Sequence, residues 1–160
     1  MIRKATAADH GMIMRIYDTA KAFMRANGNH TQWQNGYPFP DLVTEDTENG
    51  NMYVVCKDDG CVCACFGIFE GEDPTYAYIE GSWASDTPYA AIHRVASDGT
   101  ERGIFKQIFA YAAERYTHLR IDTHADNIPM QRAVTGCGFS YQGIIFVEDG
   151  TPRRAYEWIK

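Results

Sequence analysis

Two Asp-Gly dipeptides, Asp59-Gly60 and Asp149-Gly150, each lie between two apolar runs. An Asp-Gly pair in this setting is typical of a β-hairpin, whose two strands are antiparallel. The first predicted hairpin covers residues 51–71, and the second closes the chain over residues 140–159. A largely antiparallel sheet is therefore expected.

The segment that begins near Thr6 has the periodicity of an amphipathic helix. Thr6 is suited to cap this helix, Asp9 falls in its first turn, and the run from Asn27 to Asn29 signals its end. Its predicted apolar face consists of Ile13, Ile16, Tyr17, Ala20 and Phe23.

The remaining elements lie between the hairpins. Strands are expected over residues 75–83, 89–97 and 119–124, and helices after Pro40, over residues 103–116 and from Asn127 to Gly136 or Gly138. A helix between two strands makes one parallel βα unit in a mainly antiparallel sheet. We therefore expect an α+β (mixed α/β) fold of six or seven strands with about four helices. At 160 residues, the chain is expected to form a single domain, residues 1–160.

The charge and composition exclude several classes of partner. A net charge of −6 argues against a nucleic-acid partner, because phosphate binding needs a basic surface. No apolar run is long enough to span a bilayer, and the N-terminal residues lack an apolar signal region. We expect no nucleic-acid or membrane partner and a cytoplasmic protein.

Three of the five cysteines, Cys61, Cys63 and Cys65, alternate along one predicted strand and so would share one face. A metal or redox site is one interpretation of this pattern. Structural zinc sites use a C-x₂₋₄-C spacing instead, and free cysteine is often buried. The pattern therefore favours core packing and no metal.

The turn before the third helix has features of a phosphate-binding site. A helix start presents backbone N–H groups without partners and a partial positive charge. Gly103 would let an anion approach closely, and Arg102 and Lys106 add positive charge. Many turns of this kind carry Gly and Arg for structural reasons alone.

This turn and the later segment NIPMQRAVTGCGF, Asn127 to Phe139, together resemble the GNAT family of acetyl-CoA-dependent N-acetyltransferases. The family has a Gln/Arg-x-x-Gly-x-Gly/Ala loop at the central helix. Its later helix has the form Asn-x-x-Ala-x-x-Leu-Tyr, followed by Gly-Phe, which this segment matches without a gap. The order of helices and strands agrees over essentially the whole chain, and WQNGYP (residues 33–38) resembles the aromatic loop of small members.

Several positions depart from the family pattern. Thr100 stands where Gln or Arg is usual, and Phe105 replaces the second Gly or Ala, where it either crowds the pyrophosphate or packs into the core. Val134 replaces the tyrosine that serves many members as general acid, and it has no proton to donate.

The resemblance implies transfer of an acetyl group from acetyl-CoA to an amine of a small molecule or peptide. It implies pairing of the pantetheine amide near Val95 and Ser97, and a further contact at Asn127. A larger set would bind the cofactor: Val95, Ser97, Arg102, Gly103, Ile104, Phe105, Lys106, Asn127 and Met130.

An amine is mostly protonated at neutral pH, so a base or a water chain has to remove a proton before attack. His93, on the strand face of Tyr89 and Ala91, has an imidazole suited to proton relay. Glu80 would need burial to raise its pKa, and His124 follows the strand 119–124. For each of the three, a purely structural role remains an alternative.

The general acid that protonates the departing thiolate has three candidates: Cys137, Tyr141 and a proton from solvent. The acceptor pocket is expected to use Trp33, Tyr37, Trp83 and the final hairpin. Edge strands and this hairpin also offer surfaces for a homodimer. Two other functions compete with catalysis: a CoA-binding regulatory domain without transferase activity, and an unrelated α+β domain that binds no CoA.

Overall fold

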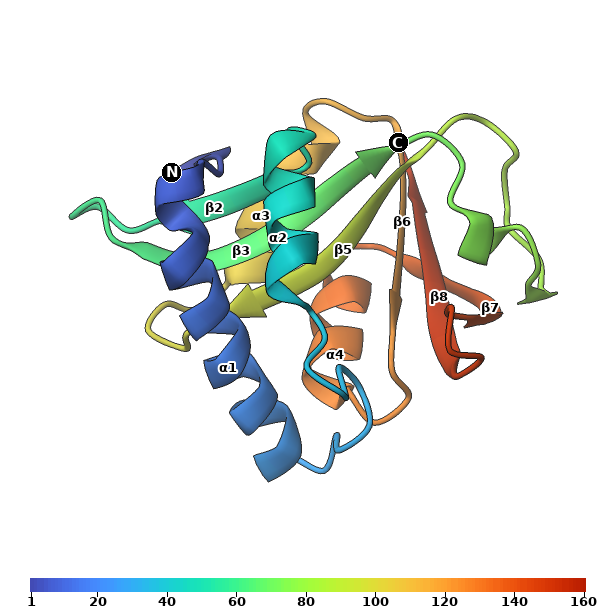
Figure 1. Ribbon diagram of the computed structural model, residues 1–160. Helices are drawn as coiled ribbons and strands as arrows, with labels where there is room; N and C mark the ends of the chain where they lie inside the picture. Colours follow the sequence, from blue (N-terminus) through green and yellow to red (C-terminus); the bar gives the residue numbers. More distant parts are fainter. The chain divides into compact units, whose positions relative to one another are not determined.

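The computed structural model describes all 160 residues. It contains eight strands, four α-helices and two short 3-10 helices (Figure 1). The strands are β1 (Ile2–Lys4), β2 (Met52–Cys56), β3 (Val62–Glu70), β4 (Glu80–Gly81), β5 (Ala90–Ser97), β6 (His118–Thr123), β7 (Ser140–Phe146) and β8 (Pro152–Ile159). The helices are η1 (Ala7–Asp9), α1 (His10–Ala26), α2 (Pro40–Glu48), η2 (Pro74–Tyr76), α3 (Ile104–Ala113) and α4 (Ile128–Gly136).

All eight strands belong to one sheet, in the order β1-β2-β3-β5-β6-β8-β7-β4. Strands β5 and β6 pair in parallel. The pairings of β1 with β2, β2 with β3, β4 with β7, β6 with β8 and β7 with β8 are antiparallel. The expected α+β fold and both Asp-Gly hairpins are confirmed. Two short strands, β1 and β4, bring the count above the six or seven expected.

The chain divides into two compact units. The first unit comprises residues 1–68 and 94–108, and the second comprises residues 69–93 and 109–160. The divisions fall within β3, β5 and α3, so each of these elements contributes to both units. We describe each unit by itself.

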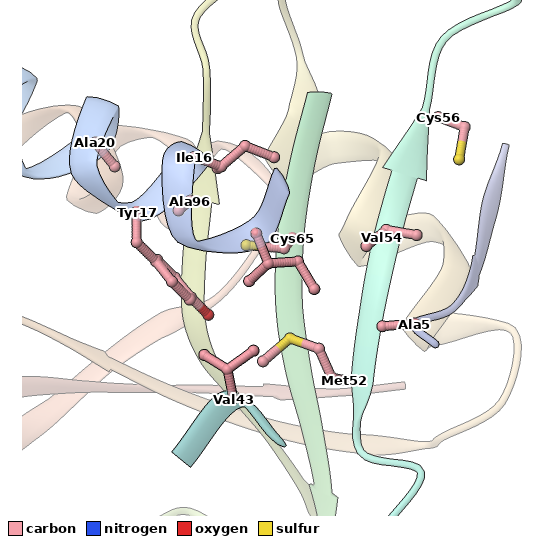
Figure 2. Close-up of a cluster of buried hydrophobic side chains, with 11 residues drawn as sticks. Ala5, Ile16, Tyr17, Ala20, Val43, Met52, Val54, Cys56, Cys65 and Ala96 are labelled. Carbon is pink, nitrogen blue, oxygen red and sulfur yellow. The ribbon is translucent and has the colours of Figure 1, made fainter. Parts of the chain in front are cut away.

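The core of the first unit lies between helices and strands. Figure 2 shows Ile16 and Tyr17 of α1, Val43 of α2, and Met52 and Val54 of β2 in one cluster. All five side chains are buried. Helices α1 and α2 thus cover one face of the strands in this unit (Figure 1).

Helix α1 follows the short helix η1, which begins after Thr6 as expected. The Asp9 carboxylate accepts the Thr6 backbone N–H at 2.8 Å, and two N–H groups of Arg3 bind the same carboxylate. The predicted apolar face is correct except for Phe23, which is exposed, while Met24 is buried instead. The buried stripe therefore drifts by one residue in the last turns of the helix.

Two of the three alternating cysteines are core residues. Cys63 and Cys65 on β3 are buried, as expected. Cys61 is exposed, because it precedes β3 and lies in the hairpin turn, where its N–H donates to Asp59. The prediction of a buried Cys61 is wrong.

In the second unit, β6 pairs with β8 along its whole length, and β8 pairs with β7. The strand predicted over residues 75–83 is wrong, since this segment contains helix η2 and the two-residue strand β4. The Asp73 side chain caps η2 by accepting the Thr75 N–H, and Pro74 suits the first helical position. Local capping therefore overrides the strand propensity of the segment.

Helix α4 has the ends that its sequence predicts. The Asn127 side chain caps it by accepting the Met130 N–H at 3.3 Å. After the helix, Gly138 has a φ of +95° and turns the chain toward β7. Phe139 is buried, with its ring 5.7 Å from that of Phe109, and so anchors this turn. None of the helices combines the length and the apolar character needed to cross a membrane.

Candidate active site

The parallel pairing of β5 and β6 is short. It runs from Ala90 opposite Leu119 to Ile92 opposite Ile121, and no further. His93 and Asp122 are the next residues of the two strands. At this point of the second unit, the side chains of His93 and Asp122 belong to one polar cluster.

His93 lies between two carboxylates. Its Nε2 is 2.7 Å from Oδ2 of Asp73, and its Nδ1 is 3.7 Å from Oδ2 of Asp122. The side chains of His93, Asp73 and Asp122 are 20%, 18% and 10% exposed, so solutes can still reach the imidazole. The structure thus places His93, one of the three predicted bases, in a charged and partly buried site.

Asp73 is held in place by several hydrogen bonds. Its Oδ1 accepts the backbone N–H and the hydroxyl of Thr75, and its own N–H donates to the Tyr89 hydroxyl. Burial alone would raise the pKa of Asp73. The hydrogen bond and charge of His93, with the Thr75 bonds, outweigh burial and lower the pKa to about 2. Asp73 is therefore ionised at neutral pH and can only accept hydrogen bonds.

Tyr76 supports the second carboxylate. Its hydroxyl donates to Oδ2 of Asp122 at 2.7 Å, and burial together with Asp122 raises the pKa of the phenol well above its usual value. The ring lies 5.8 Å from that of His93 and 5.2 Å from that of Trp83. The indole N–H of Trp83 donates to the Tyr76 carbonyl, so Trp83, a predicted substrate contact, belongs to the same aromatic cluster as His93.

A second polar cluster lies next to the first on β6 and β8. Arg120 is buried between the rings of Trp83 and Tyr89, 4.0 Å from each centroid. It also donates to Glu157, which pairs with His118 and accepts the Ala84 N–H. These bonds fix the segment before β5, which carries the aromatic side chains of the site.

The other two predicted bases are less suited to the task. Glu80 is exposed on β4, so the expected burial of its carboxyl group is absent. His124 lies just beyond β6, and its Nδ1 accepts the Asp126 N–H at 3.0 Å. Burial and the charge of Arg153 lower the pKa of His124. The Nδ1 of His124 also lies 3.6 Å from Oδ2 of Asp126.

The candidates for the acid lie in different surroundings. Val134 is fully buried in α4, at the position of the family tyrosine. Cys137 is half-buried after the helix, and Tyr141 is 49% exposed with its ring 5.7 Å from that of Tyr156. None of these observations favours Cys137 over Tyr141 as the proton donor.

The predicted phosphate-binding turn lies in the first unit, between β5 and α3. Ser97 accepts the Gly99 N–H, and Asp98 accepts the N–H and hydroxyl of Thr100. Gly103 has a φ of +67° and open space where a Cβ would be. The backbone at the start of α3 is therefore accessible to an anion.

The side chains around this turn also fit a phosphate group. Arg102 and Lys106 are exposed, as is required for contact with a ligand. Phe105 and Ile104 are buried, so Phe105 packs into the core and does not crowd the turn. Thr100, at the position of the usual Gln or Arg, uses its hydroxyl to bind Asp98.

A backbone irregularity lies in the part of β5 that belongs to the first unit. Arg94 has a φ of +53°, which is uncommon for a residue with a side chain. Its carbonyl accepts the Tyr17 hydroxyl, and its guanidinium donates to buried Asp46 and to the Tyr37 hydroxyl. These contacts hold the strained residue and set the direction of Val95 and Ser97, which are both half-buried.

The predicted aromatic loop is tied to the same network. The Tyr37 hydroxyl accepts a hydrogen bond from the Arg94 guanidinium. The Trp33 ring packs edge-on against the Tyr17 ring, with 5.4 Å between the ring centroids. Both residues belong to the first unit, whereas Trp83 belongs to the second. Asn127 and Met130 also lie in the second unit, at the start of α4.

The sequence did not single out Asp73, Tyr76, Asp122, Asp46 or Arg94. One signal was present for Asp122, because His118, Arg120 and Asp122 alternate on one face of a strand. An alternating polar face normally faces water, whereas this one is largely buried. Asp73 precedes a proline, a pattern that predicts a helix cap and not a partner of a distant histidine.

Comparisons with known proteins identify the family. A scan against family models finds no match to the chain, and a search of curated proteins finds none either. Among solved structures, the chain is similar to an acetyltransferase of the GNAT family from Streptococcus agalactiae. Sequence identity is 30%, the TM-score is 0.90, and the match covers 100% of this chain and 95% of that one.

More distant structures share the fold. A GNAT-family acetyltransferase from Listeria monocytogenes has a TM-score of 0.73 at 16% identity, covering 100% of this chain and 94% of that one. A phosphinothricin acetyltransferase from Sinorhizobium meliloti, solved in complex with AcCoA, has a TM-score of 0.66 at 14% identity, covering 99% and 87%. The full-length match at 30% identity decides the assignment: the chain is a member of the GNAT family of acetyltransferases.

Proposed function

We propose that residues 1–160 form an N-acetyltransferase that moves an acetyl group from acetyl-CoA to the primary amine of a small molecule or peptide. The observation that carries this proposal is the placement of His93 between Asp73 and Asp122, in a chain that belongs to the GNAT family. The net reaction joins the acetyl carbon to the amine nitrogen and releases CoA as its thiol, with one proton lost from the ammonium.

The proposed cofactor contacts come from three segments. The backbone near Val95 and Ser97 would pair with the pantetheine amide. The turn and helix start, Arg102 to Lys106, would hold the pyrophosphate through backbone N–H groups and two positive side chains. Asn127 and Met130 would contact the pantetheine arm. Acetyl-CoA, when bound, supplies the acetyl group as an activated thioester.

His93 is the proposed general base. An acceptor ammonium gives a proton to the imidazole, and the resulting free amine attacks the acetyl carbonyl carbon. The negative charges of Asp73 and Asp122 favour the imidazolium that this transfer creates. After the attack, the nitrogen loses its second proton to water. The thiolate takes up a proton from the imidazolium as it leaves, so the imidazole is restored and one proton is released overall. Trp33, Tyr37 and Trp83 are the proposed contacts of the acceptor.

The test is an acetyl-transfer assay with a panel of amines and detection of the acetylated product by mass spectrometry. The wild-type protein is expected to acetylate at least one amine. His93→Gln is expected to lower kcat by a factor of about 10²–10⁴, with unchanged affinity for acetyl-CoA. Equal rates for the two proteins would show that His93 is not the base.

One observation favours a second function. Val134 is buried at the position where many family members have a tyrosine that acts as general acid. Because valine has no proton to donate, this position suits a CoA-binding regulatory domain without transferase activity. In the same assay, such a domain would bind acetyl-CoA but form no acetylated product with any amine.

A further inference from the structure

We infer that Asp73 and Asp122 act on opposite sides of His93: Asp73 is a positioning residue that fixes the proton on Nε2, and Asp122 binds the acceptor ammonium beside the free Nδ1. This inference rests on the proposed function. It assigns a role to two carboxylates and limits the acceptor to amines that arrive as cations.

The tautomer follows from the partners of Asp73. Its Oδ1 already accepts two hydrogen bonds from Thr75, and its Oδ2 lies 2.7 Å from Nε2 of His93. An ionised carboxylate can only accept, so Nε2 has to donate. In the neutral ring, the lone pair then lies on Nδ1, and Nδ1 is the only nitrogen able to take a proton.

Nδ1 lies near the other carboxylate, so that an ammonium placed to one side of the pair could contact both atoms. The distance from Nδ1 to Oδ2 of Asp122 is 3.7 Å, too long for a direct hydrogen bond. At this separation, one ammonium nitrogen can lie within hydrogen-bond distance of both atoms. It would donate one proton to Asp122 and another to Nδ1, which is the proton to be transferred.

Asp122 is held ready for this role. The Tyr76 hydroxyl donates to its Oδ2, which fixes the carboxylate and leaves lone pairs for a further donor. The side chain is 10% exposed, so an ammonium bound there would be shielded from water. A neutral acceptor such as a hydroxyl group would gain much less from this carboxylate.

The groups that surround His93 are few. Asp73 lies on the segment after β3, Asp122 on β6 and Tyr76 on η2, and the Phe69 ring packs against the imidazole at 5.6 Å. No positive side chain contacts the imidazole. Removal of either carboxylate should therefore leave the imidazole with one anionic partner instead of two.

The tautomer can be tested in the wild-type protein without any assay of activity. Long-range ¹H–¹⁵N NMR of the neutral His93 ring, assigned with His93→Gln, should give a pyrrole-type shift for Nε2 and a pyridine-type shift for Nδ1. The reverse pattern would overturn the inference. Since this measurement needs no substrate, it separates failure of the positioning role from failure of the proposed transferase function.

Kinetics test the two carboxylates separately. Asp73→Asn should lower kcat for a cationic amine about 10–100-fold and leave the KM of that amine nearly unchanged. Asp122→Asn should raise the KM of the same amine at least about tenfold. Asp86→Asn removes the same charge from an exposed position of the second unit and should change neither constant.

Two results would contradict the inference while the proposed function stands. One is an Asp73→Asn enzyme with the wild-type kcat. The other is an Asp122→Asn enzyme with an unchanged KM for the amine. If the wild type neither binds acetyl-CoA nor acetylates any amine, the proposed function fails instead, and the NMR result still decides the tautomer.

Discussion

At the scale of single residues, burial decides which groups of the same chemical type can react. Cys61 and Cys65 are four residues apart, yet Cys61 is exposed and Cys65 is fully buried. Burial raises the pKa of the Cys65 thiol to about 12, although its hydrogen bond with Tyr17 lowers the pKa in part. A protonated thiol is a poor nucleophile.

Thiol labelling should therefore distinguish the two cysteines. At pH 8, a reagent such as dithionitrobenzoate should modify Cys61 in the native protein and Cys65 only after unfolding. Cys61→Ser should abolish the fast phase of the reaction. Labelling of Cys65 at the rate of an exposed thiol would contradict the buried position described here.

Asp9 illustrates how a single ion pair contributes to stability. The hydrogen bonds from Arg3 lower the pKa of Asp9 to about 2 against the opposing effect of burial. A carboxyl group with a lowered folded-state pKa stabilises the protein above its unfolded value of 3.8. This contribution is lost as the pH falls through about 2.

Asp9→Asn should thus destabilise the protein in a pH-dependent way. Urea unfolding should show a loss of about 1–2 kcal/mol at pH 7, reduced from the full linkage value because Arg3 is partly exposed, and little loss at pH 2. Asp58→Asn changes an exposed carboxylate in a hairpin turn and should have no such effect. An equal loss for Asp9→Asn at both pH values would contradict the ion-pair explanation.

At the scale of elements, the pairing of β4 with β7 depends on two glycines. A Cβ at Gly143 would lie 2.2 Å from the Glu80 carbonyl oxygen, and a Cβ at Gly81 would lie 2.2 Å from the Gln142 carbonyl oxygen. Gly143 also has a φ of +150°. The close approach of these strands therefore requires glycine at both positions.

Gly143→Ala should lower the free energy of unfolding by at least about 2 kcal/mol, since backbone atoms would have to move. For a domain of this size, that corresponds to a fall in Tm of about 4–8 °C. Gly11→Ala lies in helix α1 with no atom near its Cβ, and it should be neutral or stabilising by up to about 1 kcal/mol. A Gly143→Ala protein as stable as the wild type would rule out the close approach.

The elements differ in how well their sequences predict them. Both hairpins follow from Asp-Gly turns between apolar runs, and α4 follows from its Asn127 cap and Gly138. In these segments, local conformation and tertiary packing favour the same structure. Residues 75–83 contain β-formers, but the Asp73 cap produces a helical turn, so periodicity alone gives the wrong element.

At the scale of the whole molecule, the family and cofactor class could be predicted because their motifs are local in sequence. The detailed site could not. Asp73 and Asp122 are 20 and 29 residues from His93 along the chain, and their meeting depends on tertiary structure. His93 was one of three predicted bases, and only the structure shows that it lies between two carboxylates.

The central claim is that this chain binds acetyl-CoA despite Thr100 and Phe105. Thermal unfolding with acetyl-CoA at about 100 times its Kd should add about 2.7 kcal/mol and raise Tm by about 5–10 °C. Gly103→Glu should remove most of this shift, because its carboxylate would repel the phosphates. Gly60→Glu, at a hairpin glycine with similarly positive φ, should keep the shift. No rise in Tm for the wild type at millimolar acetyl-CoA would contradict the claim.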